Sequence, residues 1–250
     1  MELNLTDICK RHKVRANGIV HLGAHLGQEQ ELYRRLFPDQ RIVWIEADPV
    51  VYARLKDSME QEAKVTCINA VVSDVRETVT FNRANNEQSS SLLPFGTHSI
   101  VHPNVEFVDS FSVETVTLDD LAKTFDFEGF NFLLLDIQGA EGKAISGAKQ
   151  FLKQVDYIYS EVNRDELYTG CTTLVAFDEI LWNLGFVRVE LSMREVHGWG
   201  DAFYVRRTAA TLARLRVRQL WSYVKSLSPK SLFQRFQHAR CGSTGVSPVL

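Results

Sequence analysis

The 250-residue sequence is poor in the features that mark secreted or membrane-spanning proteins. Its four cysteines, Cys9, Cys67, Cys171 and Cys241, are isolated, so no C-x-x-C pair exists to bind zinc or form a redox centre. No apolar run approaches the roughly 20 residues that cross a bilayer. Charged side chains interrupt residues 1–13, which therefore lack a signal-peptide core. We expect a cytoplasmic protein with reduced thiols rather than a secreted one.

Acidic residues are missing from one part of the chain. Residues 208–250 contain seven Lys and Arg but no Asp or Glu, so the formal net charge of -3 leaves residues 1–207 at about -10. The overall composition, with 45% hydrophobic and 24% charged residues, is that of a globular protein. We therefore predict one large domain over residues 1–207, a basic helical extension over 208–240 and a disordered end at 241–250.

Short β-branched runs alternate with amphipathic stretches through the large domain. The predicted strands are residues 18–22, 41–45, 65–72, 79–81, 113–116, 130–135, 156–162, 186–191 and 202–205. The predicted helices are residues 28–37, 49–59, 118–125, 141–152 and 177–184. Alternation of this kind, closed by a hairpin, is typical of a doubly wound α/β sheet with an antiparallel edge.

The exit of the first strand is the expected ligand site, because such sheets bind ligands beyond the carboxyl ends of their central strands. Gly23 and Gly27 would let the backbone turn sharply and approach a ligand, although two glycines alone also fit a plain tight turn. Glu46 ends the second strand, where a carboxylate can accept hydrogen bonds from both ribose hydroxyls. The chain has neither a G-x-G-x-x-G nor a G-x-x-x-x-G-K-[ST] motif. A ribose-bearing ligand without a pyrophosphate indicates S-adenosylmethionine.

Several longer segments carry a more specific signal. They are VHLGAHLGQE (20–29), IVWIEADP (42–49), NAVVSD (69–74), SSSLL (89–93), VTLDDL (116–121), LLLDIQGAEGKAISGA (133–148) and YSEVN (159–163). In this order the chain resembles the FkbM-type methyltransferase family over roughly residues 16–207. The resemblance implies a Rossmann-like, seven-stranded class I methyltransferase sheet with an antiparallel last strand. It also implies transfer of a methyl group from S-adenosylmethionine to a hydroxyl.

The resemblance implies cofactor contacts at the strand ends. Gly23, Ala24 and Gly27 would line the methionine part, Glu46 the ribose, Ser73 and Asp74 the adenine, and Asp136 the methionyl end and the substrate. His21 stands where many class I enzymes have an acidic residue that orients the cofactor's amine. We expect His25 or Asp136 to take part of that role.

Methyl transfer to a hydroxyl also needs a general base, which can speed the reaction by roughly 10²–10⁴-fold. The candidates are Asp136, Glu161 and His197, with Glu141 as a fourth. Each has a structural alternative: helix capping for Asp136, a helix-dipole contact for Glu141, a hydrogen bond for Glu161 and a surface turn for His197. Asp136, Glu141 and Glu161 could also hold Mg²⁺, but three carboxylates on one rim are common without metal, and we do not favour one.

The polar, turn-rich stretch 84–103 is the candidate substrate lid, unless it is an ordinary connection. Ser90, Ser91 and His98 are its candidate acceptor-binding residues. Trp199, in a turn near the end of the domain, could stack on a sugar, although core packing is the more common role of a Trp.

Residues 209–236 combine basic side chains with an apolar spacing typical of an amphipathic helix. Such a segment can pack on the domain, pair with a second subunit or lie on an anionic membrane at the inner face. We favour packing or self-association slightly over membrane contact, and we regard nucleic-acid binding as unlikely.

The leading hypothesis is an S-adenosylmethionine-dependent O-methyltransferase acting on a saccharide, a glycolipid or a small natural product. One alternative is the same fold methylating RNA or protein. The other is a non-catalytic adaptor whose basic tail binds a membrane or a partner. The adaptor hypothesis predicts no cofactor binding and no effect of changing Gly23 or Glu46.

Overall fold

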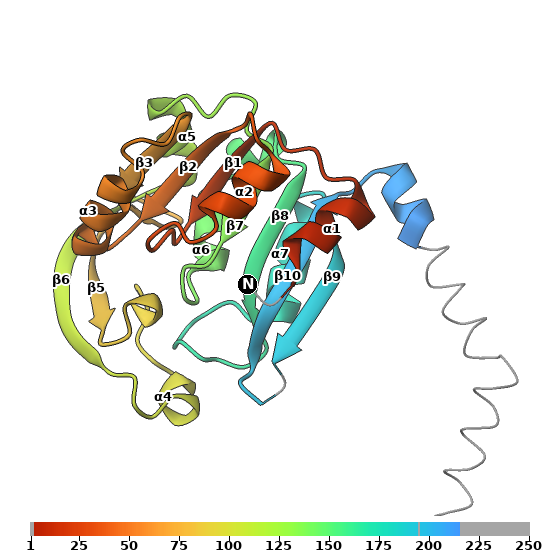
Figure 1. Cartoon of the computed structure of the whole chain (residues 1–250). Helices are drawn as coiled ribbons and strands as arrows, with labels where there is room; N and C mark the ends of the chain where they lie inside the picture. The colour runs from red at the N-terminus through yellow and green to blue at the C-terminus, as the bar shows by residue number, and fades with distance from the viewer. Residues whose placement is uncertain (1–2, 195, 216–250) are drawn as a thin grey trace, which may run out of the picture. The chain divides into compact units, whose positions relative to one another are not determined.

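The computed structural model describes residues 3–194 and 196–215 (Figure 1). Its strands are β1 (Gly18–Leu22), β2 (Arg41–Glu46), β3 (Val65–Asn69), β4 (Val71–Val72), β5 (Thr78–Ala84), β6 (Phe107–Val116), β7 (Phe132–Leu135), β8 (Tyr157–Asn163), β9 (Phe186–Arg194) and β10 (Trp199–Arg206). Its α-helices are α1 (Leu5–His12), α2 (Gln30–Leu36), α3 (Pro49–Ser58), α4 (His98–Val101), α5 (Leu118–Thr124), α6 (Glu141–Ser146) and α7 (Leu174–Asn183). Two 3₁₀ turns, η1 (Glu87–Ser89) and η2 (Phe151–Lys153), complete the elements of this range.

Seven strands form one sheet in the order β3-β2-β1-β7-β8-β10-β9. β10 runs antiparallel to both of its neighbours, whereas the pairs from β3 to β8 are parallel. The predicted doubly wound sheet with an antiparallel last strand is therefore confirmed. The chain moves outward from β1 to β3 and returns on the other side of β1 with β7, so the strand order reverses between β1 and β7. Ligands bind at such a reversal.

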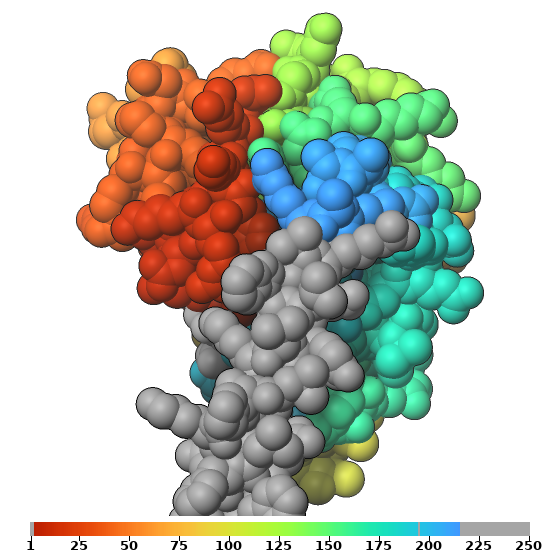
Figure 2. Space-filling model, turned by 90° about the vertical axis from the view of Figure 1, so that its right-hand side faces the viewer, coloured from red at the N-terminus to blue at the C-terminus, as the bar shows by residue number. Residues whose placement is uncertain are grey.

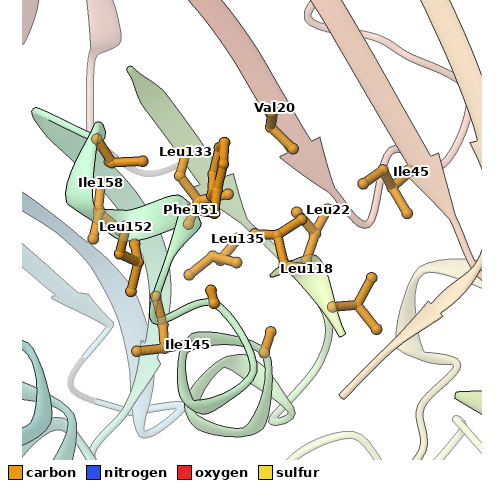
Figure 3. Packing of buried hydrophobic residues seen from close by; sticks show 14 of the residues in the cluster. Val20, Leu22, Ile45, Leu118, Leu133, Leu135, Ile145, Phe151, Leu152 and Ile158 are labelled. Atoms are coloured by element: carbon orange, nitrogen blue, oxygen red, sulfur yellow. The ribbon is translucent and has the colours of Figure 1, made fainter. Parts of the chain in front are cut away.

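Helices cover both faces of the sheet because successive residues of a strand point to opposite sides. Leu133 and Leu135 of β7 pack with Ile145 of α6 in a cluster that also contains residues of α5 and α7 (Figure 3). Phe132 and Leu134 belong to the opposite cluster, with residues of α1, α2 and α3. Figure 2, seen from the side of β9, places the red and orange segment that carries α1–α3 on one side and green to cyan segments on the other. Burial of each large apolar side chain contributes about 1.5–3 kcal/mol.

The predicted third strand, residues 65–72, is wrong as a single strand. It divides at Ala70 into β3, which pairs with β2, and β4, which pairs with β6 in a second sheet of order β4-β6-β5. The Asn69 side-chain amide donates to the carbonyls of Glu46 and Ala47, at 2.8 and 3.1 Å, where the chain leaves the large sheet. The second sheet carries the chain toward the ligand side, where β5 leads into η1 and α4 (Figure 1).

The helix predicted over residues 141–152 is also wrong in length, because α6 ends at Ser146. Asp119 of α5 interrupts it. The Asp119 amide donates to the carbonyl of Gly147 at 3.1 Å, and its carboxylate accepts from the amides of Gln150 and Phe151, both within 3.0 Å. Tertiary hydrogen bonds thus override the continuous helical spacing of the sequence.

Helix α1 was not predicted, although its signals are local. The Asn4 side chain accepts from the Asp7 amide at 3.1 Å and caps the first turn, and Leu5, Ile8 and Cys9 form one buried face. Cys9, Cys67 and Cys171 are free thiols, and Cys241 lies outside the described residues.

The chain divides into two compact units, Met1–Arg206 and Arg207–Leu250. The second unit is described only as far as residue 215, with residues 209–215 helical. Most of the segment 209–236, and all of the end 241–250, lie outside the described residues. No helix in residues 3–194 and 196–215 combines the length and the apolar character that a membrane span requires.

Candidate active site

Strand register brings polar residues together at one edge of the large sheet. Leu22 pairs with both Ile45 and Leu135, so the next residues, Gly23, Glu46 and Asp136, follow at neighbouring strand ends. Glu161 of β8 pairs with Asp201 of β10. These five residues line a cavity of about 420 Å³, a size typical of small-molecule sites.

The turn after β1 is closed by backbone contacts. The amides of Gly23 and Ala24 both donate to the carbonyl of Ile45, at 2.9 and 3.1 Å. Gly23 has a φ of +81°, and a Cβ on it would lie 1.7 Å from the carbonyl oxygen of Asp136. Only glycine fits this position, so β1 and β7 approach each other closely beneath the cavity.

Glu46 is buried at the end of β2 and orders the same turn. Its Oε2 accepts from the His25 amide at 2.8 Å and its Oε1 accepts from the Asp48 amide at 2.9 Å. Burial raises the pKa of Glu46, while these two amides oppose the rise. Each carboxylate oxygen can accept a further hydrogen bond, so two adjacent hydroxyls of a ligand could bind here.

His21 lines the cavity as a neutral group. Burial lowers its pKa to about 4, against the opposing influence of Asp136. Its Nδ1 lies 2.9 Å from the Tyr33 hydroxyl, and its ring lies against Trp44 with centroids 4.9 Å apart. The position that carries an acidic residue in many class I enzymes therefore holds an uncharged ring here.

Asp136 and Glu161 form a carboxylate pair held by one amide. The Gln138 Nε2 lies 2.7 Å from Asp136 Oδ1 and 3.3 Å from Glu161 Oε2. Asp136 is open to the cavity, yet the surrounding protein atoms and Asp201 raise its pKa. Burial, followed by the charges of Asp136 and Glu141, raises the pKa of Glu161 well above its usual range. The charge of Asp136 therefore disfavours ionisation of Glu161.

Asp201 and Gln138 belong to the site but were not among the sequence candidates. Asp201 Oδ2 accepts from the Tyr159 hydroxyl at 2.5 Å and from the Leu3 amide at 3.2 Å. The predicted closing hairpin could have indicated Asp201, because the last strand of the hairpin was expected to pair antiparallel with the strand that contains Glu161. Gln138 lies in the segment 133–148 that carries the family resemblance, but no role was predicted for it; its backbone has a φ of +54°.

Glu141 does not line the cavity. Its Oε1 accepts from the amides of Ile137 and Gly139, at 3.0 and 3.3 Å, and so supports the turn between β7 and α6. Burial raises its pKa to about 7. Within the part of the chain that the structure describes, no group of three or more His, Cys, Asp or Glu side chains could hold a metal ion.

The segment after β5 forms the opposite wall. Ser90 and His98 line the cavity, together with Asn86, Glu87, Gln88, Ser89, Leu92, His102 and Val105. Ser91 lies behind this wall, where its hydroxyl donates to the carbonyl of Gln138 at 2.7 Å. His98 is buried, and its ring stacks on that of Phe95 with centroids 4.3 Å apart. Its Nδ1 has no hydrogen-bond partner in the described residues. Burial lowers the pKa of His98 to about 4.

Four other sequence candidates lie outside the lining. His197 stacks on His102 with ring centroids 5.4 Å apart and stands behind it. Gly27 faces Met59 and Leu55 in the core. Ser73 donates to Asp74, which pairs with Lys143 at 3.4 Å. Ala70, Val71 and Val72 line the cavity on that side instead.

Comparison with known proteins identifies the chain. The family model described as "Methyltransferase FkbM domain" matches residues 21–188, more than half of the sequence. The chain belongs to the FkbM methyltransferase family. It is an S-adenosylmethionine-dependent methyltransferase, which confirms the sequence-based prediction of family, activity and cofactor.

Individual relatives of this FkbM protein are distant. The 2-O-methyltransferase NoeI of Sinorhizobium fredii (strain NBRC 101917 / NGR234) is 28% identical over 170 residues, which are 65% of this chain and 70% of NoeI. The N-terminal domain of EvdMO1, solved in the presence of SAH and D-fucose, is 12% identical with a TM-score of 0.47, over 81% of this chain and 80% of that domain. An MtNAS mutant in complex with S-adenosylmethionine is 10% identical with a TM-score of 0.42. The match covers 82% of this chain and 60% of that one, less than two thirds of its length.

The cavity residues fit the cofactor of the family. The close turn at Gly23, Ala24 and His25 would hold its methionine part, and the carboxylate of Glu46 would accept from its ribose hydroxyls. The apolar surface of residues 70–72 would contact the adenine. Asp136 lines the same cavity as this region and as the wall formed by the 86–105 segment, so it could contact both cofactor and acceptor.

Proposed function

We propose that this FkbM methyltransferase methylates a hydroxyl group of a saccharide, either free or as part of a glycolipid. The observation that carries the proposal is the carboxylate pair of Asp136 and Glu161, which faces the same cavity as Ser90, His98 and Trp199. Hydroxyl-rich ligands are bound by such sets of carboxylates, hydroxyls and imidazoles, with an aromatic ring for the apolar face of the sugar. The similarity to NoeI, a 2-O-methyltransferase, supports the choice of oxygen as the acceptor atom.

The chemistry assigned to the chain is proton removal and alignment. When bound, S-adenosylmethionine supplies a methyl group on a positively charged sulfur. With the cofactor bound, a carbon–oxygen bond would form at the acceptor as the carbon–sulfur bond broke, and Asp136 would accept the hydroxyl proton. Asp136 Oδ1 is engaged by Gln138, whereas its Oδ2 has no hydrogen bond in the described part of the protein, which suits Oδ2 to accept that proton.

Charge in the cavity favours a saccharide over a nucleic acid. The lining side chains include the carboxylates of Glu29, Glu46, Glu87, Asp136, Glu161 and Asp201, and among the described residues they include no Lys or Arg. Glu87 is paired with Arg54 of α3, and the remaining carboxylates would repel a phosphate group. The RNA-methylating alternative is therefore disfavoured.

The first experiment separates the enzyme from the adaptor hypothesis. S-adenosylhomocysteine is titrated calorimetrically into wild type, Glu46→Ala and the exposed control Glu60→Ala, with NAD as a second ligand. We expect micromolar binding of S-adenosylhomocysteine, about -8 kcal/mol, in wild type and the control, at least tenfold weaker binding in Glu46→Ala, and none of NAD.

Acceptors are then screened by transfer of a labelled methyl group to neutral saccharides and glycolipids. Methylation of a saccharide hydroxyl, mapped by mass spectrometry, is the expected result. Labelling of RNA or protein but no saccharide would overturn the proposed acceptor, and absence of S-adenosylhomocysteine binding would support the adaptor.

A further inference from the structure

We propose that Gln138 is a positioning residue of this site, whose side-chain amide sets the arrangement of Asp136 and Glu161 and ties both carboxylates to the acceptor-side wall. The inference rests on the proposed function, since it assigns Gln138 to the proton-removal step. Neither composition nor strand pattern pointed to this residue; its contacts do.

Both the nitrogen and the oxygen of the Gln138 side-chain amide form hydrogen bonds. Its Nε2 carries two hydrogens and reaches Asp136 at 2.7 Å and Glu161 at 3.3 Å. Its Oε1 accepts from the hydroxyl of Tyr168 at 2.7 Å. Ionised carboxylates only accept hydrogen bonds, so the nitrogen must face the pair and the oxygen must face Tyr168. One neutral side chain therefore holds two acidic groups together without adding a charge.

The backbone of Gln138 is strained in support of this geometry. Its φ of +54° lies in the left-handed region, which costs a residue with a Cβ about 1–2 kcal/mol. The Ser91 hydroxyl donates to the carbonyl of Gln138, and Glu141 accepts from the amides of Ile137 and Gly139 on either side. Asn or Gly would adopt this backbone conformation at lower cost. The presence of Gln at this strained position, beside the cavity, therefore indicates that its longer side chain has a function.

Gln138 also connects the carboxylate pair to the wall that would meet the acceptor. The backbone carbonyl of Gln138 accepts a hydrogen bond from the Ser91 hydroxyl. The Tyr168 hydroxyl, which donates to the side chain of Gln138, also lies 3.4 Å from the carbonyl oxygen of Ser89. Both links run to the segment that includes η1. The position of this wall and the position of the proton acceptor are thus fixed by the same residue.

Other titratable groups also face the pair. They are His21 from β1, Glu141 from α6, Asp201 from β10 and Tyr168 from the segment after β8. None of them donates to both carboxylates in the described structure. The bonds from Gln138 lower the pKa of Asp136 and of Glu161, against the rise caused by burial. Their loss should raise both values.

The test uses the full-length protein saturated with S-adenosylhomocysteine, so that it needs no acceptor. Carboxyl groups are followed by ¹³C NMR titration in wild type, Gln138→Asn, Gln138→Glu and the exposed control Gln150→Glu. Asn suits the left-handed backbone but is one carbon shorter, so it keeps the fold and loses the bonds. Glu keeps the length but adds a third carboxylate.

We expect the titration midpoints of Asp136 and Glu161 to rise by about one pH unit in Gln138→Asn, a tenfold change in proton affinity. The rise should be larger in Gln138→Glu and absent in Gln150→Glu. Chymotrypsin should also cleave the 86–95 segment several-fold faster in Gln138→Asn. Once a saccharide acceptor is known, the acid limb of the kcat profile should move by the same amount.

Unchanged midpoints in the Asn and Glu variants would overturn the inference. If one variant does not fold, the other decides alone. If the variants show the expected shifts but the wild-type protein methylates no saccharide, the proposed function is overturned and the positioning role stands.

Discussion

The two halves of the cavity are built differently. Gly23, Ala24, His25 and Glu46 form the first half, whose turn is held mainly by bonds between backbone groups and from backbone amides to one carboxylate. The His25 ring adds two side-chain contacts, to Gln28 and to Glu87. The second half, around Asp136 and the 86–105 wall, is held by side chains that bond other side chains, such as Gln138 and Tyr168. A ligand common to a family suits the first design, because main-chain geometry survives most substitutions. The second design can change with each side chain.

The sharpest test of this contrast is Gly23→Ala in the first half. Its Cβ would meet the Asp136 carbonyl at 1.7 Å, so we expect binding of S-adenosylhomocysteine to fall by at least about 100-fold and the melting temperature to drop. Gly129→Ala is the matched control, since its φ of +79° is almost the same but no atom lies within 4 Å. It should lose about 1 kcal/mol of stability and no affinity. Equal losses in both variants would mean that backbone strain, not the close approach of β1 and β7, sets the effect.

In the second half, Asp136→Asn should remove the proton acceptor and little else. The Asn oxygen can still accept from Gln138, so we expect kcat to fall about 10²–10⁴-fold while affinity for S-adenosylhomocysteine changes less than about threefold. Methyl transfer to an identified acceptor and calorimetry measure the two effects. Asp39→Asn, on the exposed surface, serves as the control. Wild-type kcat in Asp136→Asn would show that another residue accepts the proton.

The charge of the second half predicts a preference among acceptors. A neutral hexose glycoside should be methylated with about tenfold higher kcat/KM than its 6-phosphate, because the lining carboxylates repel the phosphate. Added salt should narrow the gap. A phosphorylated acceptor that is preferred at low salt would show that a cation outside this lining reaches the acceptor.

A further expected effect, on stability rather than on activity, concerns the turn between the halves. Burial raises the pKa of Glu141 from 4.5 to about 7. Between these two pH values the folded protein therefore binds more protons than the unfolded chain does. The free energy of unfolding should therefore fall as pH rises from about 4.5 to 7, by up to about 1.4 kcal/mol per pH unit for this one proton. Urea unfolding of wild type and Glu141→Gln at pH 5, 6 and 7 measures it. The Gln variant should show a flatter dependence, and parallel curves would contradict the assignment.

The first half of the site could be predicted from sequence more fully than the second. Gly23 follows β1 and Glu46 ends β2, and the register of these buried parallel strands alone brings the two ends together. In the second half only Asp136, which follows β7, could be predicted in the same way. Asp201 depends on the antiparallel pairing of β10 with β8, and Gln138 on a left-handed turn that its own residue type disfavours. Neither could be read from local spacing.

Long-range contacts also explain the elements that sequence analysis placed wrongly. The early end of α6 depends on Asp119, a residue more than twenty positions away in the chain. The division of residues 65–72 depends on pairing with β6, which follows much later. Hydrophobic periodicity contains neither contact, so a longer helix and a longer strand were the natural expectations.

The wall over the second half is joined to the rest of the protein by short β-bridges, Asn82 with Ser91 and Phe95 with Tyr168, outside the seven-stranded sheet. Its sequence therefore contributes little to the main hydrophobic core. Over evolutionary time, such a segment can be lengthened, shortened or replaced while the sheet and the cofactor turn persist. One scaffold can in this way give rise to enzymes for different acceptors by the exchange of about twenty residues.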